Sequence, residues 1–205
     1  MAFPDYEILD NFNRDNEGPP MTGWVDSLNG LKIVSNEAQG SVADEYSHSF
    51  WDAVTSSADC QSYCTIEGND GLGVFARAKE LGSGSVNLDG YVAYENSVLN
   101  KFVLYRMDDG GYTQLDLQNG QSASDGDMLG LECTGTTIKG YYNDDGAGWG
   151  ERTSAVDETY QAAGYIGLDA RYEGRCDDFG GGPFEVVEGN AGIMTPNTGF
   201  WGPTF

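Results

Sequence analysis

Catalysis by histidine is disfavoured in this chain of 205 residues, because it contains a single histidine, His48. A Ser-His-Asp arrangement would have to use that residue, and no Gly-x-Ser-x-Gly turn is present. His48 lies in an alternating segment, residues 46–50, and we expect it to be exposed or to lie on an edge strand. A zinc site is equally disfavoured, since the four cysteines show no Cys-x-x-Cys spacing.

Carboxylates are the other groups that could catalyse a reaction, and the chain has 33 Asp and Glu residues. Two carboxyl groups about 5 to 9 Å apart can hydrolyse a glycosidic bond. With so many acids, some pair meets that distance by chance. The Glu-x-Asp-x-(x)-Glu run of jelly-roll glucanases does not occur in the sequence. We therefore expect no enzyme, and a glycan hydrolase or lyase is the weakest alternative.

One acidic pair, Asp177-Asp178, differs from the acid clusters that lie in turns. It sits on a predicted strand that ends at Phe179, where Asp177 and Phe179 share one face and Asp178 takes the other. A carboxylate on the packed side of a sheet needs a partner. Lys and Arg together number only 10, so a hard cation such as Ca²⁺ is the expected partner.

The four cysteines, Cys60, Cys64, Cys133 and Cys176, limit how disulfides could form. Cys60 and Cys64 on one extended strand would lie roughly 13 Å apart, beyond the Cα separation of about 7 Å that a disulfide tolerates. Bridges from these two residues to Cys133 or Cys176 stay open, and so do buried free thiols. The redox compartment is therefore undetermined by the sequence.

The formal net charge of −23 excludes several partners. A nucleic-acid groove needs clustered Lys and Arg, and so does docking on an anionic membrane surface. No run of 18 apolar residues that could span a bilayer occurs. Residues 1–7 lack the basic and apolar regions of a secretory signal. We expect a protein made in the cytoplasm that neither binds nucleic acid nor inserts into a membrane.

Short alternating runs between glycine-rich turns predict the elements that must position these residues. The chain has 30 glycines, and no proline interrupts residues 21–182, which allows continuous sheet ladders. Period-2 alternation predicts about eleven strands, and this number indicates a β-sandwich or jelly roll. One short helical turn is expected at residues 157–163. The predicted strands cover residues 31–34, 46–53, 62–67, 73–78, 90–94, 101–107, 112–115, 128–132, 136–143, 165–168 and 174–179.

The sequence changes character at Gly180-Gly181-Gly182-Pro183, where the alternating pattern ends. We therefore divide the chain into a lectin-like jelly-roll domain, residues 1–182, and an irregular C-terminal arm, residues 183–205. The arm has no Lys or Arg but several large aromatic residues, which a free tail would avoid. It could fold back onto the sandwich or dock on a neighbouring subunit. The candidate docking residues are Phe184, Phe200, Trp201 and Phe205.

Four segments follow one another in a recognisable order: LDNFNRDNEGPP at 9–20, GLKIVSN at 30–36, AAGYIGL at 162–168 and DDFGGG at 177–182. The first resembles the DxFNRxxxxP start of the concanavalin A-like, LamG-type jelly-roll domains found in tailed-phage virion proteins and some bacterial surface proteins. The second is similar to their second strand, and the last two are similar to their end. The resemblance covers residues 6–182. It implies an all-β sandwich of two antiparallel sheets, one concave and one convex.

The same resemblance implies two kinds of site. Many relatives hold a structural Ca²⁺ between the N-terminal segment and the last strand, which makes Asp177 a ligand and Asp10, or the backbone near Asn11, its counterpart. Aromatic residues on the concave face of this family stack on sugars, because a flat ring fits a pyranose face. Simple sheet packing is the alternative role. The candidate glycan-binding residues are Tyr91, Tyr94, Tyr105, Tyr141 and Trp149.

The resemblance and the charge together favour a non-enzymatic virion protein, either a capsid decoration or a tail or fibre component. We expect it on the outer surface of the virion, away from the packaged genome. Its expected partners are other virion proteins, further copies of itself as a homo-oligomer, and cell-surface glycans. A free-standing, calcium-dependent carbohydrate-binding module is the first alternative, and a glycan hydrolase or lyase is the second.

Overall fold

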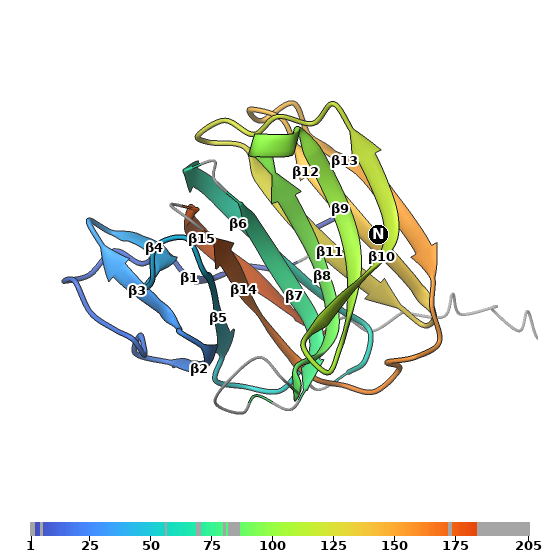
Figure 1. Ribbon diagram of the computed structural model, residues 1–205, viewed down its shortest axis with the longest axis horizontal. Helices are drawn as coiled ribbons and strands as arrows, with labels where there is room; N and C mark the ends of the chain where they lie inside the picture. Colours follow the sequence, from blue (N-terminus) through green and yellow to red (C-terminus); the bar gives the residue numbers. More distant parts are fainter. Residues whose placement is uncertain are drawn as a thin grey trace, which may run out of the picture.

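Two antiparallel β-sheets pack face to face in the computed structural model, which describes residues 3–4, 6–55, 57–68, 71–79, 81, 87–171 and 174–183 (Figure 1). One sheet has eight strands and the other has seven. The fold is the predicted jelly-roll sandwich of two antiparallel sheets. No helix of the described residues is long and apolar enough to cross a membrane.

The strands follow a different order in space than in sequence. The eight-stranded sheet runs in the order β13 (Trp149–Val156), β12 (Thr137–Asn143), β11 (Met128–Thr134), β6 (Cys60–Gly68), β15 (Arg175–Pro183), β4 (Glu37–Gly40) and β3 (Leu31–Val34), with β1 (Ile8–Asp10) also paired to β15. The seven-stranded sheet runs in the order β10 (Gly111–Asn119), β9 (Lys101–Asp108), β8 (Asp89–Asn96), β7 (Leu72–Lys79), β14 (Tyr165–Arg171), β5 (Tyr46–Trp51) and β2 (Trp24–Leu28).

The core between the sheets is built from alternate residues of the strands. In β8, Tyr91 and Ala93 belong to this core, whereas Val92 and Tyr94 belong to a second apolar cluster on the other face of the strand. Both pairs are buried. One face of an antiparallel sheet commonly meets water and carries polar residues. The seven-stranded sheet instead carries a second apolar layer on its outer face.

Several elements differ from the predicted ones. The alternation does not predict β1, β2, β4 or β13. In β13 only one residue is buried and half are exposed, so its side chains show no apolar period. Residues 157–163, expected as a helical turn, form no helix. This irregular segment instead supplies polar contacts to the seven-stranded sheet, as described below.

β15 continues through the glycine run to Pro183, so the predicted end of the pattern at Gly180 is wrong. A Cβ atom at Gly180 would lie 2.3 Å from the Tyr63 ring, and Gly181 has a φ of +146°. The glycines therefore let the strand pass close to Tyr63 and do not end it. The described part of the chain ends at Pro183. Four predicted docking residues lie outside it: Phe184, Phe200, Trp201 and Phe205.

Candidate functional site

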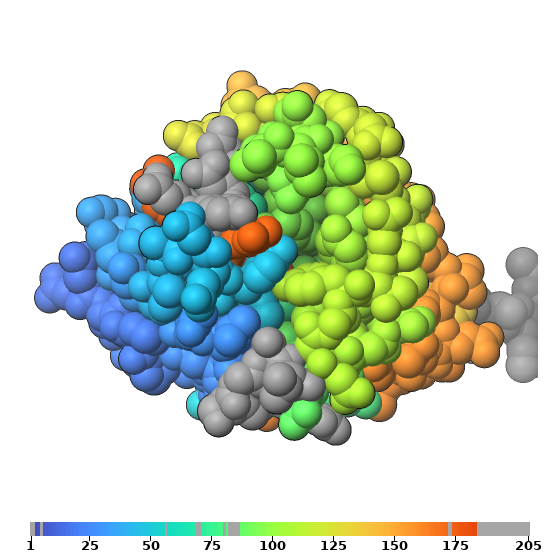
Figure 2. Space-filling view, viewed as in Figure 1, coloured from blue at the N-terminus to red at the C-terminus, as the bar shows by residue number. Residues whose placement is uncertain are grey.

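The outer face of the seven-stranded sheet gathers aromatic and charged side chains from six strands. Figure 2 looks onto this face, which is hollowed between the cyan residues of β5 and the yellow-green residues of β9 and β10. We call the group the outer-face cluster. Its members are Tyr46, His48, Phe75, Tyr94, Tyr105, Tyr112, Asp169 and Arg171.

Cross-strand pairing brings rings of β5 and charges of β14 together. Tyr46 and His48 are two residues apart on β5 and so share one face. Tyr46 lies opposite Arg171, and His48 lies opposite Asp169, in the antiparallel register. The sheet therefore sets a cation and a carboxylate of one strand beside two rings of the next.

Tyr112 reaches into the cluster from the far edge of the sheet. It lies on the edge strand β10, yet its ring centroid is 5.4 Å from that of Tyr46 and 5.3 Å from that of Tyr105. Its hydroxyl donates a hydrogen bond to Asp169 Oδ2 at 3.0 Å. Residues so distant in strand order meet only because the sheet curls strongly. The concave face is thus the outer face of the seven-stranded sheet.

A buried polar pair lies beneath these rings. His48 is 1% exposed and Asp169 0%, and His48 Nε2 lies 3.4 Å from Asp169 Oδ1 and 3.4 Å from the Tyr112 hydroxyl. Burial raises the pKa of Tyr112 well above its ordinary value, and the Asp169 charge adds to the shift. Tyr112 is therefore a neutral donor to a buried carboxylate. The expectation that His48 is exposed or on an edge strand is wrong, because β5 lies between β14 and β2.

The rim of the cluster consists of side chains that solvent reaches. Tyr46, Tyr105 and Arg171 are half-buried. The guanidinium carbon of Arg171 lies 4.7 Å from the Tyr46 ring centroid, and its Nη1 donates to the Tyr46 hydroxyl at 3.4 Å. This contact holds the guanidinium over the ring. The rim therefore offers aromatic surface together with planar hydrogen-bond donors.

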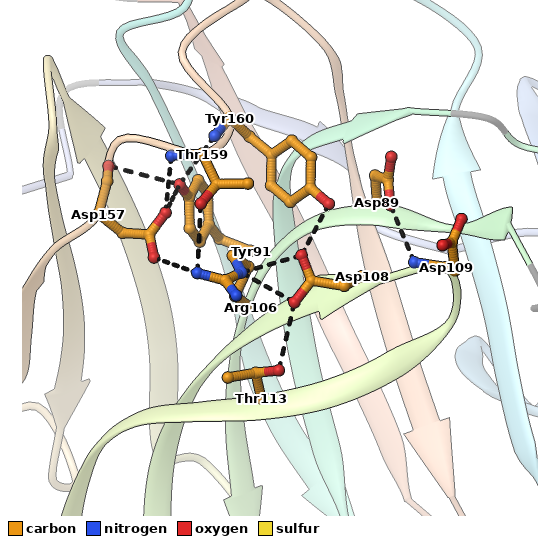
Figure 3. Close-up of polar contacts among 9 residues, drawn as sticks. All are labelled: Asp89, Tyr91, Arg106, Asp108, Asp109, Thr113, Asp157, Thr159 and Tyr160. Atoms are coloured by element: carbon orange, nitrogen blue, oxygen red, sulfur yellow. Dashed lines mark hydrogen bonds and ion pairs between the residues drawn. The ribbon is translucent and has the colours of Figure 1, made fainter.

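A polar network anchors the β9–β10 hairpin, which carries Tyr105 and Tyr112 (Figure 3). Arg106 Nη1 pairs with Asp157 Oδ2 at 2.6 Å, and Arg106 Nε pairs with Asp108 Oδ2 at 2.8 Å. Arg106 thereby ties the hairpin to the irregular segment 157–163. The two cluster tyrosines are positioned from this anchored hairpin.

Asp157 is the central acceptor of the network. It accepts the Tyr91 hydroxyl at 2.7 Å and the Thr159 N–H at 2.8 Å. Burial opposes ionisation, but hydrogen bonds from Tyr91, Thr159 and Arg106 lower the pKa of Asp157 to about 2. Tyr91 is 0% exposed and its ring lies in the core between the sheets. Contrary to the expectation, Tyr91 is not available to a glycan, because its whole side chain is buried.

The other aromatic candidates fall into two groups. Tyr94 and Tyr105 belong to the outer-face cluster, where Tyr94 is buried and Tyr105 half-buried. Tyr141 and Trp149 lie on the eight-stranded sheet, and Phe3 packs on them with ring centroids 4.3 Å and 4.8 Å away, respectively. The five predicted residues therefore do not form one site. The structure brings two of them to the concave face.

Asp10 pairs with an arginine and does not lie open to a cation. Arg14 Nη1 and Nη2 donate to Asp10 Oδ1 and Oδ2 at 2.6 Å and 3.0 Å. The Trp24 indole N–H donates to Oδ2 at 2.8 Å, and the Phe12 N–H donates to Oδ1 at 2.9 Å. Both carboxylate oxygens are satisfied by protein donors. Asp10 is therefore not free to be the metal ligand that the resemblance implies, and its alternative, the backbone near Asn11, stays a prediction.

Asp177 is half-buried among other acids. Burial raises its pKa, and the charges of Asp178, Glu37 and Asp10 add to that shift. In the described part of the chain, no group of three or more His, Cys, Asp or Glu side chains could hold a metal ion. The residues present thus do not fit a structural Ca²⁺ held by Asp10 and Asp177, since the first is neutralised by Arg14.

Tyr46, Tyr112 and Arg171 are members of the cluster that the sequence did not predict as site residues. The ring-bearing positions 46, 48 and 50 are visible in the sequence, and their spacing puts three rings on one face of a strand. No local pattern links Tyr112 to Asp169, which are 57 residues apart. Their contact depends on the curvature of the whole sheet.

Comparisons with solved structures find similar folds. The carbohydrate binding module CBM66 from Bacillus subtilis matches with 17% identity and a TM-score of 0.58, over 78% of this chain and 92% of that chain. The metal-free VIP36 exoplasmic/lumenal domain matches with 12% identity and a TM-score of 0.61, over 91% and 95%. A protein of unknown function with a galectin-like fold from Bacillus subtilis matches with 11% identity and a TM-score of 0.60, over 89% and 98%. Neither a scan against protein-family models nor a search of curated proteins finds a match.

One further similar structure is matched only in part. The GH43 protein BlXynB from Bacillus licheniformis matches with 9% identity and a TM-score of 0.55, over 90% of this chain but only 40% of that protein. The likeness is thus confined to part of that protein. Together these structures establish that the chain has the jelly-roll sandwich of lectin-like and carbohydrate-binding domains.

Proposed function

We propose that this chain is a non-enzymatic, glycan-binding jelly roll that holds its ligand at the outer-face cluster. The observation that carries the proposal is the contact of Arg171 with Tyr46 at the rim of a concave, aromatic-lined face. Aromatic surface packs against sugar rings, and guanidinium donors hydrogen-bond hydroxyl groups in fixed directions. A carbohydrate binding module and a Ca²⁺/Man-bound form of the VIP36 domain, which have similar folds, support this class of ligand.

Contacts among the cluster side chains pre-organise the proposed site. Tyr112 packs on both Tyr46 and Tyr105, and its own hydroxyl is held by Asp169. The hairpin that carries Tyr105 and Tyr112 is held by Arg106. Side chains that are fixed before binding lose little conformational entropy when the ligand arrives. A rigid rim of this kind suits recognition without a conformational change.

No reaction is part of the proposal. Asp169, the carboxylate of the cluster, is fully buried and accepts a hydrogen bond from Tyr112. Glycoside hydrolysis needs two carboxyl groups about 5 to 9 Å apart that reach the scissile bond. Asp169 cannot reach a bound sugar, so this face binds a glycan without cleaving it.

Charge narrows the proposed ligands to neutral glycans. The net charge of −23 repels polyanionic chains, and such repulsion extends about 10 Å at 0.1 M salt. Arg171 is the cation of the cluster, and its guanidinium is already engaged with Tyr46. Because Asp10 and Asp177 do not fit Ca²⁺, glycan binding is proposed to be independent of calcium.

The site of action in our proposal is the outer surface of a virion. Support comes from the resemblance of residues 9–20 and 177–182 to virion domains and from the acidic surface, which keeps an exposed protein soluble. Residues 183–205 would dock on other virion proteins or on a second copy. Deleting them should abolish particle association while leaving the fold and glycan binding intact. Unchanged association after the deletion would contradict this placement.

A glycan array probed with the purified chain tests the binding function. We expect signals on neutral oligosaccharides that persist in the presence of a chelator and that Arg171→Ala reduces. Arg152→Ala is the matched control, because Arg152 is an exposed arginine on β13 of the other sheet. Background signal across the array would overturn the proposal. Release of reducing sugar from any bound polysaccharide would overturn its non-enzymatic part.

A further inference from the structure

The four cysteines meet in two pairs inside the sandwich. All four are buried thiols on three adjacent strands of the eight-stranded sheet. Cys60 and Cys64 lie on β6, Cys133 lies on β11 on one side of it, and Cys176 lies on β15 on the other side. Each of the two strands that flank β6 thus places one thiol near a thiol of β6.

Cys60 and Cys133 are direct cross-strand partners. Directly opposite residues of an antiparallel pair have Cα atoms about 4.5 to 5.5 Å apart. Disulfides take Cα separations of about 4.4 to 6.8 Å. Both side chains are buried in the core between the sheets, so they lie on the same face of the sheet. This pair can therefore be bridged without moving the backbone.

Cys64 and Cys176 are less well placed for a bridge. Both side chains also lie in the core between the sheets, but the register sets Cys176 opposite Ile66, two residues beyond Cys64. Diagonal neighbours of this kind are about 7 to 8 Å apart, which is at or beyond the disulfide limit. Cys64 and Cys176 thus provide an internal control, because they are buried like Cys60 and Cys133 but are too far apart for an unstrained disulfide.

A fully buried arginine lies beside the first pair. Arg77 is 0% exposed, and it contacts the two residues before Cys60, through Nε to the Ala58 carbonyl at 2.6 Å and Nη2 to Asp59 Oδ1 at 3.4 Å. The neighbouring Cys133 thiol lowers the pKa of Cys60 against the effect of burial, and the Arg77 charge lowers it further. The Asp59 charge opposes the effect of Arg77, whereas burial raises the pKa of Cys133. Cys60 is thus the thiol of the pair that ionises more readily, and the thiolate is the nucleophile.

We propose that Cys60 and Cys133 form a redox-active pair that closes to a disulfide between β6 and β11, whereas Cys64 and Cys176 stay reduced. The oxidant is a small disulfide such as oxidised glutathione. The Cys60 thiolate attacks one glutathione sulfur and releases one glutathione thiolate. Cys133 then loses its proton and attacks the mixed disulfide at the Cys60 sulfur, which releases the second glutathione. Two protein thiols are oxidised and one small disulfide is reduced to two thiols.

Burial decides when this exchange occurs. Cys60 is flanked in the sheet by Cys133 of β11 and Pro183 of β15. Its side chain is 0% exposed, so an oxidant in solution cannot reach the thiol in the closed sheet. Exchange therefore requires local opening of the sheet or takes place before the sheet closes. Once formed, the bridge closes a long loop and should raise the melting temperature.

The test maps the thiols of the purified chain after equilibration in glutathione buffers. One sample is equilibrated folded, and a second is refolded from denaturant in the same buffer, so that slow access does not decide the result. Free thiols are alkylated under denaturing conditions and the peptides are identified by mass spectrometry. We expect a Cys60–Cys133 cross-link with a mass lower by two hydrogen atoms, alkylated Cys64 and Cys176, and a Tm higher by roughly 5 to 15 °C.

Matched variants separate the two pairs. Cys64→Ala should keep the oxidation-dependent rise in Tm, and Cys133→Ala should lose it. If Cys133→Ala fails to fold, the peptide map of the unaltered chain still shows which cysteines are linked. The absence of a Cys60–Cys133 link in both samples, or a link through Cys64 or Cys176 at lower oxidant concentration, would overturn the proposal.

Discussion

The Tyr112 hydroxyl lies 3.0 Å from Asp169 Oδ2, although three strands separate β10 from β14 in the sheet. The contact requires the seven-stranded sheet to curl until its edge hairpin stands over its centre. That curvature creates the hollow seen in Figure 2. It also buries a carboxylate beneath the rim and supplies a donor to its Oδ2. Concavity and the rigidity of the proposed binding face thus have one cause.

Replacing Tyr112 by phenylalanine tests that relationship. Tyr112→Phe keeps the ring but removes the hydrogen bond to the buried Asp169 carboxylate, so we expect a loss of about 1 to 3 kcal/mol in the free energy of unfolding. Denaturant titration measures it. Tyr105→Phe is the control, since Tyr105 lies in the same cluster without a hydrogen bond to Asp169, and it should change stability by less than about 0.5 kcal/mol. Equal effects of the two variants would contradict the assignment.

Removing a half-buried ring of the rim should weaken glycan binding. Tyr105→Ala takes aromatic surface from the concave face, and we expect a dissociation constant about tenfold higher, equivalent to roughly 1.4 kcal/mol. Titration calorimetry with a glycan found on the array gives the value. Tyr141→Ala removes a half-buried tyrosine from the opposite sheet and should leave the affinity unchanged. A larger loss of glycan affinity in Tyr141→Ala than in Tyr105→Ala would indicate that the glycan binds to the eight-stranded sheet instead.

The anchor of the hairpin should make stability depend on acid pH. The pKa of Asp157 is about 2 in the folded chain against an ordinary 3.8. Its ionised form therefore stabilises the fold fully above about pH 4, and this contribution of roughly 1 to 2 kcal/mol is lost as pH falls toward 2. Asp157→Asn should be destabilised at pH 7 and should approach the unaltered chain near pH 2.5.

A surface pair provides the control for that pH dependence. Glu151 pairs with Lys139 at 2.8 Å, but its side chain is 43% exposed. Glu151→Gln should therefore change stability by less than about 0.5 kcal/mol at either pH. If Asp157→Asn had the same unfolding free energy as the unaltered chain at pH 7, the network around Asp157 would not stabilise the fold.

The sequence carries the strand content but not the site. Alternation predicts the strands that contain Tyr46 and Tyr105, but the strand predicted at residues 165–168 ends one residue before Asp169. Tyr91 and Tyr94 on β8 are three residues apart, and this odd spacing puts them on opposite faces of the sheet. The partner of Tyr112 could not be predicted, since it depends on accumulated twist across many strands.

The sequence near the predicted metal site contains the residue that pairs with Asp10. Asp10 and Arg14 are four residues apart in the segment that resembles the start of LamG-type domains, and they form the ion pair that occupies Asp10. The resemblance implied a cation there, whereas the chain supplies its own from Arg14. A charged residue close in sequence is therefore the first partner to consider before a metal.

Opposite responses of Asp10 and Asp177 to neutralisation would distinguish the ion pair from a calcium site. Asp10→Asn removes the charge that Arg14 and the Trp24 indole hydrogen-bond, so we expect a loss of about 2 to 4 kcal/mol. Asp177 has a raised pKa, so its ionised form is disfavoured by folding, and Asp177→Asn should leave stability at pH 7 unchanged or slightly higher. Differential scanning fluorimetry with added Ca²⁺ and with a chelator measures both variants. A calcium site would instead make Asp177→Asn destabilising as well as Asp10→Asn. It would also lower the Tm of the unaltered chain when the chelator is added. Either of these two results would support Asp10 and Asp177 as calcium ligands.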